Sequence, residues 1–131
     1  MSAFIGNLDV RLVQDSAGGL WSLLVPFSYQ SDLAGVTITV PSGFDTDFCS
    51  VPRVPLIYDM LGDRARRSGT VHDWLYTCQR FTREESDMIL REMLEVDGID
   101  HIESQAMYEA VRLCGGAHWL TNPNKDTSCK A

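Results

Sequence analysis

The chain has 131 residues, of which 44% are hydrophobic and 22% are charged, and its formal net charge is −7 at pH 7. This composition is typical of a globular chain long enough to form its own core, so it excludes disorder throughout. The negative charge would repel a nucleic acid backbone. We therefore expect no nucleic acid partner and a preference for metal cations.

Residues 1–42 have the patterns of β-strands. Residues 8–13 alternate apolar and polar side chains, and residues 20–27 contain aromatic and β-branched types. These two runs flank a turn that contains Gly18 and Gly19, which is typical of a β-hairpin. Val36–Val40 indicates a third strand. The first third of the chain is therefore predicted to be a three-stranded antiparallel meander.

Residues 43–55 are predicted to form an irregular central loop. Pro52 and Pro55 exclude a helix interior or a central strand in this segment. Loops of this kind often carry functional side chains. Asp45 and Asp47 are therefore candidate metal ligands, with a solvated Asp45 and a turn-capping or Arg53-paired Asp47 as the structural alternatives.

Residues 56–120 have a helical pattern that predicts three helices, and residues 121–131 form a polar tail that we expect to be loose. The first helix is capped by Ser68 or Thr70 and runs through Gln79. The second opens with the capping box of Thr82 and Glu85 and ends at Gly98, and the third is capped by Asp100 and stops at Gly115. Together these elements predict one α+β domain over residues 1–131.

The chain shows no sign of export or membrane insertion. Its first residues lack a basic region followed by a long apolar run, and no stretch approaches the roughly 20 apolar residues of a transmembrane segment. The four cysteines form no Cys-x-x-Cys pair, which argues against a zinc ribbon. We expect buried, reduced thiols and synthesis in a reducing cytoplasm.

Four polar side chains in the helical part suggest a catalytic site. His72 and Tyr76 lie four residues apart and so share one helix face, and Asp73 is rotated from His72 by roughly 100°. Asp87 lies at the edge of the apolar face of the next helix. The short connection at residues 80–81 predicts antiparallel packing, which would bring His72, Tyr76 and Asp87 together.

Such a site could hydrolyse an ester without a serine or cysteine nucleophile. A neutral His72 would take a proton from water while Asp87, held by Tyr76, fixes the tautomer of the imidazole. Asp73 would bind Ca²⁺, which polarises the ester carbonyl. The structural alternative is a buried hydrogen-bond network that only holds the two helices together.

Zinc is a second metal that the sequence allows. His118 could complete a zinc site with His72 and either Asp73 or Asp47, because two histidines and acidic ligands can hold this ion. The chain has no His-x-x-x-His spacing to support it. Calcium is therefore the preferred cofactor and zinc the alternative.

The segment His72-Asp73-x-x-Tyr76, followed by a helix that bears Asp87, resembles the secreted phospholipase A2 superfamily, particularly its prokaryotic and viral-capsid branches. The resemblance covers residues 58–94. It implies that His72 is the base, Asp73 the calcium carboxylate, and Tyr76 and Asp87 a supporting pair, with a phospholipid or another ester as substrate. The glycine-rich calcium loop of that superfamily has no counterpart here, so further oxygens would come from Asp45, Asp47 or the backbone of Gly43.

A second resemblance covers residues 43–87. The motifs Gly-Phe-x-Thr-Asp-Phe-x-Ser-Val-Pro-Arg at residues 43–53 and His-Asp-Trp-Leu-Tyr at residues 72–76 are similar to those of an uncharacterised family of tailed-phage and prophage proteins, a domain of unknown function. Members usually have Ala where this chain has Cys49. The resemblance implies a phage origin, synthesis in the host cytoplasm and no established activity.

Two functions are consistent with these patterns. The first is a phage-encoded, phospholipase A2-like hydrolase that acts when the phage enters or lyses its host. The second is a non-enzymatic virion protein of the tail or baseplate, docked to other tail proteins through Trp21, Phe27 or Trp119. An effector that acts on a host protein is a third alternative. The enzyme requires a water-accessible His72 beside an apolar groove, whereas the structural role allows an enclosed one.

Overall fold

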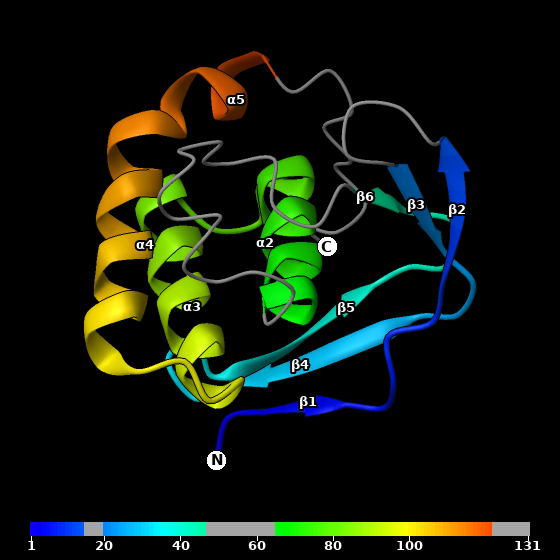
Figure 1. Ribbon diagram of the computed structural model, residues 1–131, viewed down its shortest axis with the longest axis horizontal. Coiled ribbons are helices and arrows are strands. Elements are labelled where there is room, and N and C mark those ends of the chain that lie inside the picture. The colour runs from blue at the N-terminus through cyan, green and yellow to red at the C-terminus, as the bar shows by residue number, and fades with distance from the viewer. Residues whose placement is uncertain (15–19, 47–64, 122–131) are drawn as a thin grey trace.

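The computed structural model describes residues 1–14, 20–46 and 65–121, apart from the side chains of His118 and Thr121 (Figure 1). Strands come first and helices follow, which confirms the predicted α+β class. The strands are β1 (Ala3–Ile5), β2 (Val10–Gln14), β3 (Leu20–Leu23), β4 (Phe27–Ser31), β5 (Val36–Val40) and β6 (Asp45–Thr46). The helices are α2 (Arg66–Cys78), α3 (Arg83–Val96), α4 (His101–Cys114) and α5 (Gly116–Thr121).

The strands form two small antiparallel sheets, with the orders β1-β4-β5 and β2-β3-β6, instead of the predicted single meander. The predicted hairpin of β2 and β3 is present, with Val10 opposite Leu23. The predicted second strand, however, is split into β3 and the start of β4. Pro26 lies at this break, and proline cannot donate a hydrogen bond to a strand ladder. As a result β5 pairs with β4 and not with β3.

β6 is a short strand inside the segment that was predicted to be irregular. It pairs with β3, and Thr46 lies opposite Trp21. In Figure 1 the β1-β4-β5 sheet runs beneath α2 and α3, and the β2-β3-β6 sheet stands to the right of α2. The rest of the predicted central loop, residues 47–55, lies outside the described residues, as does the tail from residue 122.

The core lies between the β4-β5 hairpin and the helices. Phe27 and Tyr29 of β4 and Ile38 and Val40 of β5 are at most 2% exposed, because alternate residues of a strand face the same side. They pack in one cluster with apolar side chains of α2, α3 and α4. Phe27, one of the three alternative docking residues of the virion hypothesis, belongs to this core and not to the surface.

The capping signals of α3 and α4 are confirmed. The Glu85 amide donates to the Thr82 hydroxyl at 3.1 Å, and the Thr82 amide donates to the Glu85 carboxylate at 3.1 Å. The hydrogen bond from the Thr82 amide lowers the pKa of the Glu85 carboxyl. Asp100 accepts from the Glu103 amide at 2.8 Å, and Gly115 is the C-cap of α4 as predicted.

The predicted start of α2 is wrong. The helix begins at Arg66, and its N-cap Ala65 makes no side-chain capping bond. Ser68 and Thr70 are buried within its first turns. The Ser68 hydroxyl donates to the Asp97 carboxylate at 2.7 Å, so it joins two helices instead of capping one. The predicted end is correct to within one residue, since α2 stops at Cys78.

Polar contacts hold α2 and the β4-β5 hairpin against α3. At its C-terminal end, Asp97 accepts from the Arg67 guanidinium, with an Nε–Oδ1 distance of 2.9 Å. Near its middle, Glu92 accepts from the Tyr29 and Ser31 hydroxyls, both at 2.7 Å. The start of α2 is therefore tied to the end of α3, as antiparallel packing requires, and the β4-β5 hairpin is tied to the same helix.

Two further expectations concern thiols and membranes. Cys78 is a buried free thiol as predicted, whereas Cys114 is exposed, and Cys49 and Cys129 lie outside the described residues. Across the described ranges, no helix combines the length and apolar character needed to cross a membrane.

Candidate functional site

The structure brings the three predicted catalytic side chains together at the interface of α2 and α3. His72 Nε2 lies 2.9 Å from Asp87 Oδ1, and the Tyr76 hydroxyl donates to the same oxygen at 2.7 Å. The two rings stack along α2 with centroids 4.5 Å apart. The helical spacing and the short connection between the helices thus predicted this convergence, while the catalytic roles of the three residues stay a prediction.

The other oxygen of Asp87 accepts a hydrogen bond from an arginine that the sequence did not indicate. Arg112, from the last turn of α4, donates from Nη1 to Asp87 Oδ2 at 2.9 Å. Arg83 Nη1 lies farther from this oxygen, at 3.9 Å, and donates to the carbonyls of Val111 and Arg112 at 3.3 Å. The i,i+4 spacing of Arg83 and Asp87 was a signal in the sequence. Arg112 belongs to a third helix, and no local pattern pointed to it.

The carboxylate at the centre of the site is ionised although it is fully buried. Burial alone would raise the pKa of Asp87. The hydrogen bond and charge of His72, together with hydrogen bonds from Tyr76 and Arg112, outweigh this effect and lower the pKa. Burial and the hydrogen bond to Asp87 raise the pKa of Tyr76, so its phenol remains a donor.

His72 is held by one nitrogen and is 3% exposed. Nε2 meets Asp87, whereas Nδ1 has no hydrogen-bond partner among the described residues. No buried polar side-chain atom in the described part of the chain lacks a partner. Nδ1 is therefore the imidazole nitrogen that is left to meet water.

Helix α5 packs against the site beside Tyr76. The Trp119 ring stands edge-on to the Tyr76 ring, with centroids 5.1 Å apart and an interplanar angle of 87°. The Gln79 amide donates to the Trp119 carbonyl at 2.9 Å. Trp119, proposed as a docking residue, is therefore half-buried against the site.

Of the three residues predicted to bind calcium, the structure describes Asp73 and Asp45. Asp73 is buried and accepts from the Thr46 hydroxyl at 2.6 Å, so it faces β6 while His72 faces α3. Asp45 is exposed, because neighbouring residues of a strand point to opposite faces. Asp47 and the side chain of His118 lie outside the described residues.

Calcium requires six to eight oxygen ligands, and zinc usually takes four ligands. Within the ranges that the structure describes, no group of three or more histidine, cysteine, aspartate or glutamate side chains could hold a metal. The described donors therefore do not fit either ion by themselves. Calcium, with zinc as the alternative, stays a prediction from the sequence.

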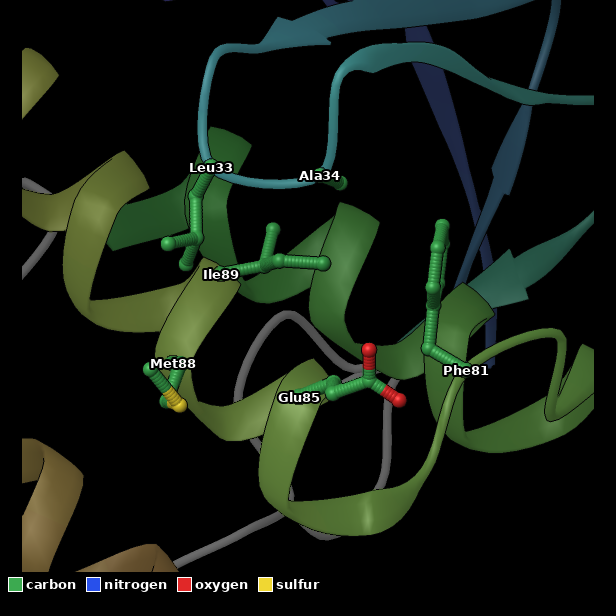
Figure 2. Close-up of a pocket in the computed structure, with 6 residues that line it drawn as sticks. All are labelled: Leu33, Ala34, Phe81, Glu85, Met88 and Ile89. Carbon is green, nitrogen blue, oxygen red and sulfur yellow. The ribbon is translucent and has the colours of Figure 1, made fainter.

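A small apolar hollow lies on another face of α3 (Figure 2). Its volume is about 130 Å³, and its lining comes from the β4-β5 turn, the connection after α2 and the first turns of α3: Leu33, Ala34, Phe81, Glu85, Met88 and Ile89. Asp87 is two residues from Glu85, which places it about 200° around the helix. This hollow is therefore not the groove that the enzyme hypothesis expects beside His72.

The fold and the site define a class of protein: a small α+β protein in which an ionised, enclosed aspartate orients a histidine across two antiparallel helices. The family model described as "Protein of unknown function (DUF1353)" matches residues 21–111, which is more than half of the chain. The protein belongs to this family. No curated protein matches it, and no solved structure does.

The match confirms the resemblance to an uncharacterised family, and it spans both motifs, at residues 43–53 and 72–76. The family description assigns no activity. The comparisons give no support to the phospholipase A2 resemblance or to a phage origin, and both stay predictions.

Proposed function

We propose that this protein is an ester hydrolase with His72 as general base and Asp87 as the residue that orients it. The observation that carries the proposal is the 2.9 Å contact between His72 Nε2 and Asp87 Oδ1, with Nδ1 unbonded among the described residues. A carboxylate on one nitrogen fixes the proton there, so the other nitrogen is a proton acceptor.

The reaction would follow from this geometry. Nδ1 of His72 takes a proton from a water molecule as the water oxygen forms a bond to the ester carbonyl carbon. The tetrahedral intermediate then collapses, the bond to the alcohol oxygen breaks, and His72 returns the proton to the leaving alcohol. The products are a carboxylic acid and an alcohol. Asp87 stabilises the imidazolium that exists between the two proton transfers.

The substrate class rests on the resemblance to phospholipase A2. That resemblance supports a phospholipid ester, hydrolysed when a phage enters or lyses its host. It also supports calcium dependence, with Asp73 as a ligand. The described carboxylates and histidines do not fit calcium by themselves. The proposed proton transfers therefore involve only His72 and water, and the experiment compares activity with and without calcium.

One observation favours the alternative of a non-enzymatic virion protein of the tail or baseplate. His72 is 3% exposed and Asp87 is completely buried. A network that only stabilises the helix pair has no need of water, whereas a catalytic base must reach it. In that role the histidine, the tyrosine and the aspartate would hold α2 to α3 while the outer surfaces contact other tail proteins.

The test compares the wild type with His72→Asn on phospholipid vesicles and on a soluble short-chain ester, with calcium and with a chelator. We expect His72→Asn to lose ester cleavage by a factor of about 10² to 10⁴, the usual contribution of a general base, while circular dichroism shows an intact fold. His101→Asn is the matched control, because His101 is exposed and pairs with Glu95 on the surface.

Equal activity of His72→Asn and the wild type would refute the proposal. Absence of cleavage in the wild type under every condition would also refute it. Mass spectrometry of purified phage particles then tests the virion role. That role requires the protein to be present in the particles at a fixed copy number.

A further inference from the structure

We infer that Arg112 is a positioning residue for the histidine–aspartate pair: it holds the Asp87 carboxylate towards His72 and places a guanidinium beside it. The inference rests on the proposed function for its catalytic meaning, but its geometric content can be tested separately. Arg112 belongs to α4, whereas His72 and Asp87 belong to α2 and α3.

The orientation of Asp87 depends on both of its oxygens. Oδ1 accepts from His72 and Tyr76, at 2.9 and 2.7 Å, and Oδ2 accepts from Arg112 at 2.9 Å. A carboxylate bound on both sides cannot rotate without breaking a hydrogen bond. Without Arg112, the nearest described cation to Oδ2 is Arg83 at 3.9 Å, which is beyond hydrogen-bond distance.

Arg112 also places a positive charge beside the buried Asp87 carboxylate. A buried carboxylate is costly unless a cation or strong donors compensate it, and the Asp87 side chain is 0% exposed. Arg83 directs its guanidinium to the last carbonyls of α4, which carry the partial negative charge of a helix end. Arg112 remains as the close counter-charge.

The contact between Arg112 and Asp87 uses one guanidinium nitrogen, Nη1. A lysine can replace a single hydrogen bond of this kind, although it could not replace a bidentate one. The variants Arg112→Gln and Arg112→Lys therefore separate the loss of the cation from the loss of the side chain. Arg91→Gln is the matched control, since Arg91 also joins α3 to α4, through Gln105 at 2.8 Å, without contacting Asp87.

Two measurements are made on each variant: kcat and KM for ester cleavage, and the proton NMR signal of His72 Nε2–H, assigned by its absence in His72→Asn. We expect Arg112→Gln to lower kcat roughly tenfold to hundredfold, the range for residues that orient a metal-ligating histidine, with little change in KM. The Nε2–H signal should be lost or should exchange with water faster than in the wild type, because Asp87 would no longer be held against Nε2. Arg112→Lys should restore part of both, and Arg91→Gln should match the wild type.

An unchanged Nε2–H signal in folded Arg112→Gln would overturn the inference. Unfolding of both Arg112 variants while Arg91→Gln stays folded would also overturn it, because Arg112 would then be a structural residue. If the wild type cleaves no ester, the proposed function fails, and the NMR signal alone still decides whether Arg112 positions His72 and Asp87.

Discussion

Gly115 lies directly against the hydroxyl of Tyr76: a Cβ atom at position 115 would be 2.6 Å from Tyr76 Oη and 2.7 Å from the Val111 carbonyl oxygen. Real Cβ atoms do not approach other atoms so closely. Gly115 therefore ends α4, as the sequence predicted, and also makes room for the phenol that binds Asp87.

Gly115→Ala should destabilise the protein by about 1–3 kcal/mol, the usual cost of an extra methyl group in a packed site. The backbone at Gly115 has φ −81°, which alanine adopts easily, so the effect would be steric. The free energy of unfolding in urea measures it.

Gly116→Ala is the control for this substitution, because among the described residues a Cβ at Gly116 meets only the Arg83 Cζ, at 4.0 Å. We expect that variant to stay within about 0.5 kcal/mol of the wild type. Equal stability of the two alanine variants would show that Tyr76 does not need the space.

Asp87→Asn keeps the shape of the side chain and removes its charge. Arg112 and Arg83 would lose their buried counter-charge, and the amide would present a different donor pattern to His72 and Tyr76. Breaking a buried ion pair in this way costs about 3–5 kcal/mol, and we expect a loss of that order in the free energy of unfolding. Asp45→Asn, at an exposed aspartate, should change it by less than about 0.5 kcal/mol.

Local sequence patterns were sufficient for the helices and for part of the site. The four-residue spacing of His72 and Tyr76, and the short connection before the capping box at Thr82, constrain which faces of two consecutive helices meet. No distant part of the chain was needed for this step. The convergence of both residues on Asp87 could therefore be predicted from about one quarter of the chain.

The remaining features depend on contacts between distant segments. Arg112 reaches Asp87 from a third helix, and Thr46 reaches Asp73 from a short strand. Neither contact leaves a periodic signal in the sequence. The split of the predicted strand at Pro26 was visible locally, but strand partners are chosen by side-chain packing, which a single-strand pattern does not specify.

Acid should destabilise the protein through Asp87. Its pKa is lowered in the folded state, because the hydrogen bonds from His72, Tyr76 and Arg112 outweigh the effect of burial. Its stabilising contribution is therefore complete above the ordinary aspartate pKa of about 3.9 and is lost as the pH falls through the lower folded value. The urea midpoint of the wild type should fall more steeply than that of Asp87→Asn as the pH drops from about 5 towards 2. Parallel curves would contradict this assignment.

Alkali should destabilise the protein through Tyr29 and Tyr76, which are buried. Burial, and hydrogen bonds to Glu92 and Asp87, raise the pKa values of these phenols. Above the ordinary tyrosine pKa of about 10 the unfolded chain loses these protons while the folded protein keeps them, so stability falls as the pH rises. Each phenol steepens the fall by up to about 1.4 kcal/mol per pH unit. Tyr76→Phe should therefore reduce the slope of unfolding free energy against pH above about pH 10, and Tyr29→Phe should reduce it independently. A slope that Tyr76→Phe leaves unchanged would mean that the Tyr76 phenol ionises as readily in the folded protein as in the unfolded chain.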